Sequence, residues 1–160
     1  MPAAVLVDAG PLVAIVDRAD AHHAACVEAL TNVHAPLRTA WPCVVEAVYL
    51  LASVRGGSDA ILGMIEDHAV EIAALEPGDL ARVRELMAKY ASLPMDFADA
   101  ALVRIAERDR CFHVFTLDTR HFSTYRLAGR RTLSLVPIEG ALPSPRRRRK
   151  TRRPAPRRRV

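Results

Sequence analysis

Cysteines are few in this sequence of 160 residues, and they form no recognisable motif. Cys26, Cys43 and Cys111 are far apart, their number is odd, and the chain contains no Cys-x-x-Cys pair. This pattern excludes a disulfide framework and a zinc knuckle, which both need regularly spaced cysteines. We expect the three thiols to pack as small apolar groups in a reducing environment.

Long hydrophobic runs are also missing. No apolar stretch approaches the ~18–20 residues that cross a bilayer, and the candidate over residues 39–54 is interrupted by Glu46. The first apolar run stops at Asp8 and no basic residue precedes it. We therefore expect no signal peptide, no membrane association and a cytoplasmic location.

Acidic residues are absent from positions 146–160, which hold ten of the 23 Lys and Arg residues. The preceding 145 residues hold 13 basic and 18 acidic residues, a net charge of −5, although the whole chain carries +5. We predict one acidic domain over residues 1–142 and a disordered basic tail over 143–160, because Pro, Ser and Arg cannot form a core. The tail either adds non-specific affinity for RNA phosphates or is a solvated appendage without a specific role.

Strand and helix patterns alternate along the rest of the chain. Apolar or β-branched runs predict strands over 3–7, 70–75, 112–117 and 133–138, and residues 32–38 are expected to be a loop. Amphipathic or apolar patterns predict helices ending near residue 17 and over 20–30, with Asp20 as the cap, 42–54, 58–68, 77–90 and 96–108. The expected class is α/β: a three-layer α/β/α sandwich around a central parallel sheet of four to five strands.

Acidic residues are expected at the carboxyl edge of this sheet, where α/β folds bind ligands. Asp8 and Asp118 each follow a strand, and Asp96 and Asp99 begin a helix that runs antiparallel to the strands. Glu46 lies roughly 6 Å from the start of its own helix and joins them if that helix begins at the same edge.

Gathered carboxylates need a positive partner. Two unit charges 5 Å apart repel by roughly 3 kcal/mol at an effective dielectric constant of about 20. Oxygen ligands favour Mg²⁺ or Mn²⁺, and such ions activate water and neutralise charge in phosphodiester hydrolysis. The sequence therefore predicts a divalent-metal site that acts on a phosphodiester.

Each candidate also has a structural interpretation. Asp8, Asp96 and Asp118 are suited to helix caps or turns, and Asp99 suits the positive end of a helix. Glu46 interrupts an apolar run, where an unpartnered carboxylate is costly, and its structural alternative is a lone surface glutamate. The histidines lack metal-ligand spacing, so we expect structural or exposed roles for His22, His23, His113 and His121.

Four segments, in order, resemble the PIN domain family and most closely its VapC-type toxins. They are VLVDAGPLVA over 5–14, VVEA over 44–47, DFADAAL over 96–102 and FTLDTRHF over 115–122. The resemblance covers about residues 3–138 and excludes the tail. It implies a metal-dependent endoribonuclease that leaves 5′-phosphate and 3′-hydroxyl ends, a homodimer, and neutralisation by a small antitoxin that inserts a segment into the active-site groove.

The resemblance also implies roles for individual residues. Mg²⁺ or Mn²⁺ would be held by Asp8, Glu46, Asp99 and Asp118, with support from Asp96 and Thr116. Many family members carry Ser or Thr where this chain has Ala9, so a supporting hydrogen bond is lost there. The RNA target and the RNA-binding residues are not identified, although four arginines close to the acidic edge in sequence are candidates for phosphate contacts: Arg120, Arg126, Arg130 and Arg131.

Other functions could use the same residues. A non-catalytic module would hold a basic partner peptide in the acidic groove without turnover. A DNA nuclease would use the same chemistry, because nothing in the sequence reads a 2′-hydroxyl. A phospho-acceptor receiver domain is disfavoured because it needs a lysine near its aspartate, and the chain has only Lys89, within a helix, and Lys150, in the tail.

Overall fold

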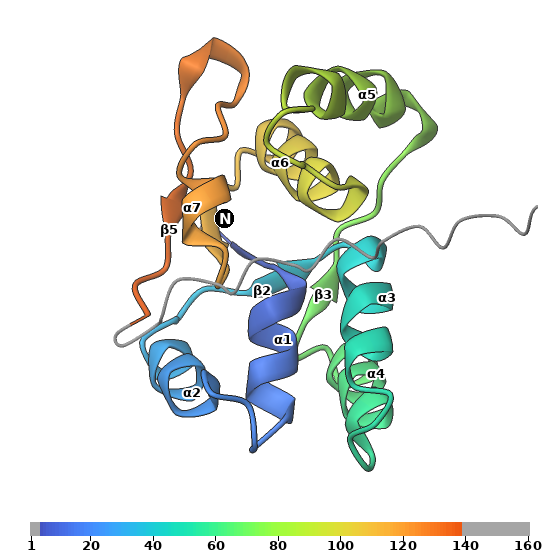
Figure 1. Cartoon of the computed structure of the whole chain (residues 1–160), viewed down its shortest axis with the longest axis vertical. Helices are drawn as coiled ribbons and strands as arrows, with labels where there is room; N and C mark the ends of the chain where they lie inside the picture. Colours follow the sequence, from blue (N-terminus) through green and yellow to red (C-terminus); the bar gives the residue numbers. More distant parts are fainter. Residues whose placement is uncertain (1–3, 139–160) are drawn as a thin grey trace, which may run out of the picture.

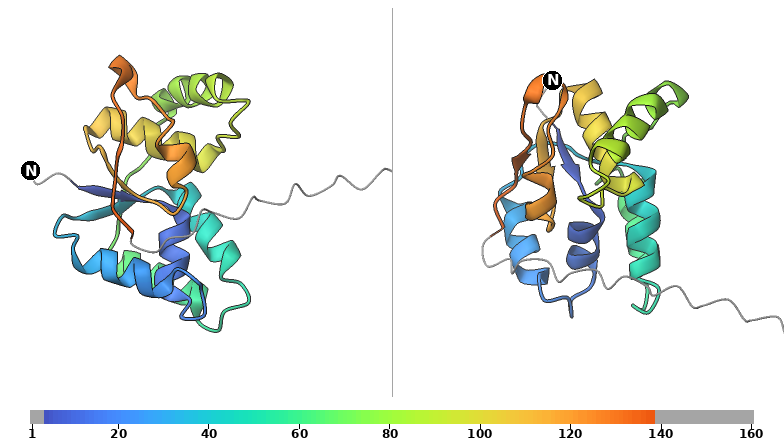
Figure 2. Two further views of the ribbon diagram at one scale, coloured as in Figure 1. Left: turned by 60° about the vertical axis from the view of Figure 1, so that its left-hand side comes forward. Right: turned by 45° about the horizontal axis from the view of Figure 1, so that its top comes forward.

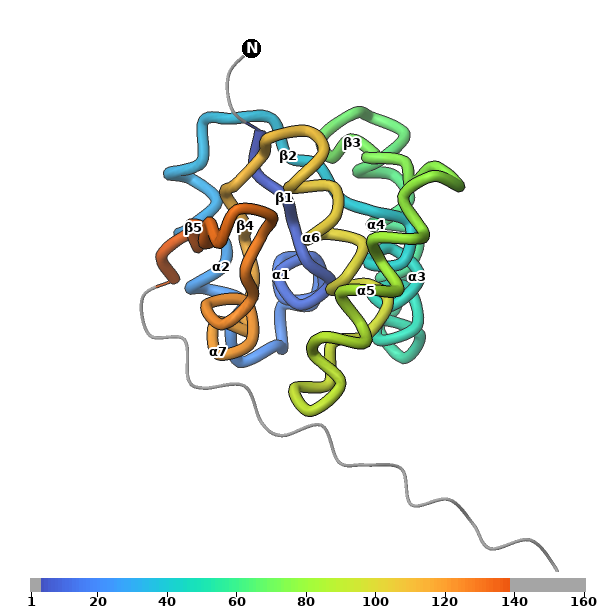
Figure 3. Tube along the Cα trace, turned by 90° about the horizontal axis from the view of Figure 1, so that it is seen from above, coloured from blue at the N-terminus to red at the C-terminus, as the bar shows by residue number. Residues whose placement is uncertain are grey.

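Five short parallel strands form one sheet in the computed structural model, which describes residues 4–138. The order across the sheet is β3-β2-β1-β4-β5, as the view from above shows (Figure 3). The central strand β1 therefore pairs with both β2 and β4. The strands are β1 (Val5–Val7), β2 (Leu37–Thr39), β3 (Glu71–Ile72), β4 (His113–Phe115) and β5 (Ser134–Leu135).

Helices cover both faces of the sheet. One face carries α1 (Ala9–Val16), α2 (His23–Thr31), α3 (Trp41–Leu50) and α4 (Gly57–Glu66), below the strands in Figure 1. The other face carries α5 (Leu80–Lys89) and α6 (Phe97–Asp109), and both further views show the same two layers (Figure 2). Short helical segments complete the fold: η1 (Pro77–Asp79), α7 (Thr119–Phe122) and η2 (Ala128–Arg130). The predicted α/β/α sandwich is confirmed.

The core is built from small and branched apolar residues. All three residues of β1 are buried, as a parallel strand covered on both faces requires. On α6, Ala100, Ala101 and Leu102 are fully buried. Alanine side chains allow close packing of this helix in the core.

The expected loop over 32–38 was wrong at its end, because β2 begins at Leu37. The strand is only three residues long and contains the charged Arg38, which hides its pattern. The Arg38 guanidinium pairs with Asp109 at 2.9 Å, and the buried Thr39 hydroxyl donates to the carbonyl of Val7 at 2.7 Å. These long-range contacts stabilise a strand that its own three residues do not predict.

The cap expected at Asp20 was also misplaced. Helix α2 begins at His23, and Asp20 instead accepts a hydrogen bond from the backbone N–H of His22 at 2.7 Å. Asp20 therefore closes the turn before the helix.

The predicted domain boundary at residue 142 and the basic tail over 143–160 lie outside the described residues. Within residues 4–138, no helix has the length and apolar character needed to cross a membrane.

Candidate functional site

Asp8 lies at the end of β1 and caps α1. Its Oδ1 accepts from the backbone N–H of Ala9 at 2.7 Å, and its Oδ2 accepts from the Thr116 hydroxyl at 2.8 Å. Thr116 is fully buried and directly follows β4, the neighbour of β1. Both oxygens of Asp8 are thus oriented by groups at adjacent strand ends.

Asp118 is joined to Asp8 through the same threonine. The Thr116 hydroxyl accepts from the backbone N–H of Asp118 at 3.0 Å while it donates to Asp8. Asp118 caps α7, with its Oδ1 accepting from the N–H of His121 at 3.2 Å. Its Oδ2 lies 2.6 Å from His121 Nδ1. The Thr116 hydroxyl therefore links the Asp8 carboxylate to the backbone of Asp118, whose own carboxylate contacts His121.

Asp96 and Asp99 meet the same edge from α6. They form a reciprocal capping box: Asp96 Oδ1 accepts from the N–H of Asp99 at 2.9 Å, and Asp99 Oδ2 accepts from the N–H of Asp96 at 3.4 Å. The Tyr125 hydroxyl also donates to Asp99 Oδ2, at 3.2 Å. The structural interpretation of Asp96 as a helix cap is confirmed, and the same cap fixes the Asp99 carboxylate.

Burial and repulsion between carboxylates raise the pKa values of Asp8 and Asp99. Burial raises the pKa of Asp99 to about 8, and the charges of Asp96 and Asp8 add to the effect. Burial likewise raises the pKa of Asp8; hydrogen bonds from Thr116 and Ala9 partly oppose this, and the charges of Asp96 and Asp118 reinforce it. The carboxylate charges are therefore close enough to repel one another in a poorly solvated region.

Glu46 is half-buried on α3, which starts directly after β2 and contacts α1 and α6. Pro42 occupies the first turn, as expected. Cys43 is buried, and after burial itself the Asp8 charge is the next largest influence raising the pKa of its thiol. Glu46 lies one turn after Cys43, so the two residues share a side of α3.

The donor chemistry of this site fits a hard divalent cation. Among the described side chains, no three acidic, histidine or cysteine groups are gathered tightly enough to hold a metal ion by themselves. Mg²⁺ does not require such a cage, since it is usually held by one or two carboxylates together with water and substrate phosphate. A dication would also offset the repulsion that raises the pKa values of Asp8 and Asp99.

Two contacts of the site were missed by sequence reasoning. The contact of His121 with Asp118 agrees with the structural role expected for this histidine, but the partner was not predicted, although its spacing three residues after Asp118 in a short helix was the available signal. Tyr125 lies 26 residues from Asp99, so only the fold could reveal their hydrogen bond.

Two of the four candidate arginines have local partners. The Arg126 guanidinium donates to the carbonyls of Ser123 and Tyr125, and that of Arg131 lies 4.3 Å from the centre of the Phe112 ring. Arg120 is exposed on α7, two residues after Asp118.

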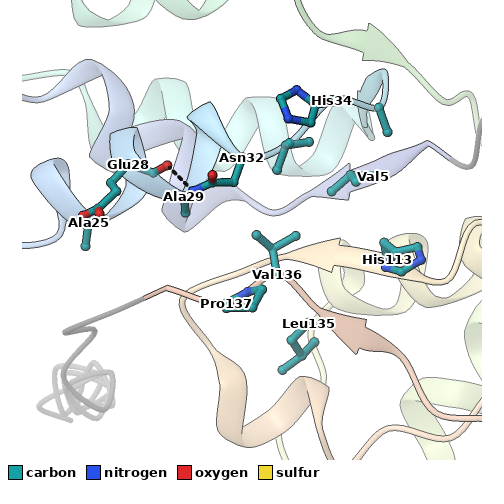
Figure 4. Close-up of a pocket in the computed structure, with 12 residues that line it drawn as sticks. Val5, Ala25, Glu28, Ala29, Asn32, His34, His113, Leu135, Val136 and Pro137 are labelled. Carbon is teal, nitrogen blue, oxygen red and sulfur yellow. Dashed lines mark hydrogen bonds between the residues drawn. The ribbon is translucent and has the colours of Figure 1, made fainter.

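A cavity of about 550 Å³ lies between α2, the starts of β1 and β4, and the end of β5 (Figure 4). Val5 and His113, which line it, are the first residues of β1 and β4. The acidic candidates are not among its lining residues. The aspartates therefore lie outside this cavity.

Known proteins resemble this chain in both sequence and structure. The family model of the PIN domain matches residues 5–127. Ribonuclease VapC26 of Mycobacterium tuberculosis is 32% identical over 136 residues, which is 83% of this chain and 100% of that protein. The crystal structure of M. tuberculosis VapC20, described as a Sarcin-Ricin loop cleaving toxin, matches with a TM-score of 0.64 at 14% identity, covering 69% of this chain and 86% of that one. At this identity the second likeness shows a shared fold.

Proposed function

Since the chain belongs to the PIN domain family, as a VapC-type member, we propose that it is a metal-dependent endoribonuclease toxin that hydrolyses RNA phosphodiester bonds. The observation that carries the proposal is the meeting of aspartates from three separate segments at one edge of the sheet. The curated relative, which is named a ribonuclease and matches along its whole length, supports RNA as the substrate.

We assign four carboxylates to the site of Mg²⁺ or Mn²⁺, with some as direct ligands and the others acting through bound water: Asp8, Glu46, Asp99 and Asp118. When bound, the dication supplies a water of lowered pKa and neutralises charge on the scissile phosphate. Asp96 and Thr116 have supporting roles. Asp96 holds the start of α6, and Thr116 orients Asp8 while satisfying the backbone of Asp118.

The carboxylates of this site are preorganised in the absence of substrate. Asp8 is held at both oxygens, so little rotamer freedom is lost when it binds a cation. Burial of Asp8 and Asp99 lowers the local dielectric constant, which strengthens their attraction for positive charge. The N-termini of α1 and α6 favour the negative charge of the Asp8 and Asp96 carboxylates that cap them.

Protein partners are a further part of the proposal. Trp41, Val45 and Tyr49 are spaced four residues apart on α3 and are 52%, 66% and 68% exposed. An exposed apolar stripe of this kind supports a protein contact. We propose a small antitoxin as a partner and a homodimer as the assembly, in the cytoplasm where RNA is available. Light scattering of Val45→Glu, alone and with the antitoxin, would report which contact uses the stripe.

A cleavage assay tests the activity. RNA is incubated with the wild-type protein and Mn²⁺ or Mg²⁺, with a chelator in place of the metal, and with Asp8→Asn. The matched control is Asp59→Asn, the same change at an exposed aspartate of α4. We expect cleavage by the wild-type and Asp59→Asn proteins, and none with the chelator or Asp8→Asn. Undiminished cleavage by Asp8→Asn would remove the mechanism.

Two added arms separate the alternatives. A single-stranded DNA of the same sequence separates a ribonuclease from a DNA nuclease. Calorimetry with Mn²⁺ separates an enzyme from a non-catalytic module, which would bind a basic peptide and show no metal binding tighter than the millimolar range.

A further inference from the structure

Tyr125 is a fully buried residue whose hydroxyl contacts a carboxylate of the acidic site. The hydroxyl donates to Asp99 Oδ2 at 3.2 Å, and the side chain is 0% exposed. A buried hydroxyl needs a partner, since an unsatisfied one is costly. Phenylalanine at this position would fill nearly the same volume and would bury no polar atom. The hydroxyl therefore calls for an explanation beyond packing.

The ring that carries this hydroxyl is tightly held. It packs against Tyr90 at a centroid distance of 5.1 Å and edge-on against Phe122 at 5.3 Å. The hydroxyl of Tyr90 accepts from the backbone N–H of Arg126, the next residue in the chain, at 2.8 Å. The N–H of Tyr125 itself donates to the carbonyl of His121 at 3.1 Å. Displacing the hydroxyl would thus require the whole cluster to repack.

The hydrogen bonds of Asp99 are distributed unevenly between its two oxygens. Oδ2 accepts from both the Tyr125 hydroxyl and the N–H of Asp96. Neither of these bonds involves Oδ1. The two donors approach from different elements, so together they fix the rotation of the carboxylate about its χ2 bond.

We propose that Tyr125 is a positioning residue of the metal site: its hydroxyl anchors Asp99 Oδ2 and thereby presents Oδ1 to the dication. This inference rests on the proposed function. A donor outside the coordination shell both orients a ligand and stabilises its charged form, and losing such a donor typically weakens metal binding about 10–100-fold. Tyr125 acts through Asp99 and does not touch the substrate.

The test compares Tyr125→Phe with Tyr90→Phe by calorimetric titration of Mn²⁺ into metal-free protein. Both changes remove one hydroxyl from the same aromatic cluster, but only the hydroxyl of Tyr125 contacts a carboxylate in the hydrogen bonds above. We expect Tyr125→Phe to raise the dissociation constant for Mn²⁺ about tenfold with unchanged stoichiometry. Tyr90→Phe is expected to bind as the wild type does, and saturating Mn²⁺ should restore RNA cleavage by Tyr125→Phe.

A merely structural role would give a different result. A partly unfolded Tyr125→Phe protein would bind fewer ions per chain at an unchanged dissociation constant, and that outcome overturns the inference. An unchanged affinity at full stoichiometry overturns it too. NMR of the wild-type protein provides a test that does not depend on the folding of a variant. Titration with Mg²⁺ should shift the ring ¹³Cζ resonance of Tyr125, and the shift should give the same dissociation constant for Mg²⁺ as calorimetry. A Tyr125 resonance that stays in place would contradict the inference.

Failure of the inference and failure of the proposed function are distinguishable. A wild-type protein that binds no Mn²⁺ and cleaves no RNA overturns both. A wild-type protein that binds and cleaves, beside a Tyr125→Phe protein that does so equally well, overturns the role of Tyr125 alone.

Discussion

Replacing Asp99 by asparagine is expected to stabilise the metal-free protein at alkaline pH. Burial, followed by the charges of Asp96 and Asp8, raises the pKa of Asp99 from 3.8 to about 8. Between these two values the folded protein holds a proton that the unfolded chain has released. The free energy of unfolding therefore falls as the pH rises from about 4 to about 8, and this loss is complete above pH 8.

Asparagine removes this loss because it carries no charge. Its side-chain carbonyl has the shape of the carboxylate and can still accept the hydrogen bonds of Tyr125 and Asp96. At about 1.4 kcal/mol for each pH unit, the interval from 3.8 to about 8 corresponds to at most about 6 kcal/mol. Structural relaxation and water entry reduce this, so we expect Asp99→Asn to gain about 2 kcal/mol at pH 9 and almost nothing near pH 4. For a domain of this size, the gain at pH 9 corresponds to about 6 °C in Tm.

Urea unfolding in the presence of a chelator measures the effect. The wild-type, Asp99→Asn and Asp59→Asn proteins are compared at pH 5, 7 and 9. The difference between Asp99→Asn and the wild type should grow steadily with pH, whereas Asp59→Asn should follow the wild type. A wild-type stability that does not decline between pH 5 and 9, or a parallel decline in Asp99→Asn, would refute the reasoning that the aspartates repel one another in a buried site.

Three further changes test the metal site and the ion pairs that stabilise the fold around it. Thr116→Val keeps the shape of a buried side chain but removes the hydroxyl that donates to Asp8, so urea unfolding should show a loss of about 1–3 kcal/mol and calorimetry an Mn²⁺ dissociation constant about tenfold higher. Asp79→Asn weakens the ion pairs of the buried Asp79 with Arg104 and Arg108, in the part of α6 away from Asp99; stability should fall by about 2 kcal/mol while calorimetry finds the affinity for Mn²⁺ unchanged. Addition of Mn²⁺ should raise Tm more at pH 8 than at pH 5, because protons compete with the metal for Asp99; an equal rise at both pH values would point to binding elsewhere.

Much of the acidic edge follows from the order of the elements along the chain. Asp8 and Asp118 follow strands that proved to be neighbours in the sheet, and parallel strands bring their carboxyl ends to one edge. Asp99 joins them because α6 runs back against the strand direction. These placements need only the positions of strands and helices, and those were visible in the hydrophobic pattern.

Capping and clustering proved not to be competing interpretations. Asp8, Asp96 and Asp118 each cap a helix, as their sequence contexts allowed. A cap fixes a carboxylate at a helix N-terminus, and the N-termini of α1, α6 and α7 lie at the ends of strands or beside them. The structural role is therefore what brings these side chains together.

Other features depend on contacts between distant residues and leave no local trace. Strand β2 is stabilised by Thr39 bonding to β1 and by Arg38 pairing with α6, neither of which its own three residues reveal. The double role of Thr116 and the bond from Tyr125 to Asp99 arise only when separate segments have packed.

Anomalous diffraction from crystals grown with Mn²⁺ tests the central claim most directly. We predict a peak at the manganese absorption edge that contacts the carboxylates of Asp8 and Asp99, at the carboxyl edge of the sheet, and that disappears in Asp8→Asn. No peak at that edge with millimolar Mn²⁺, or a peak only in the cavity beside His113, would contradict the assignment of these aspartates to a metal site.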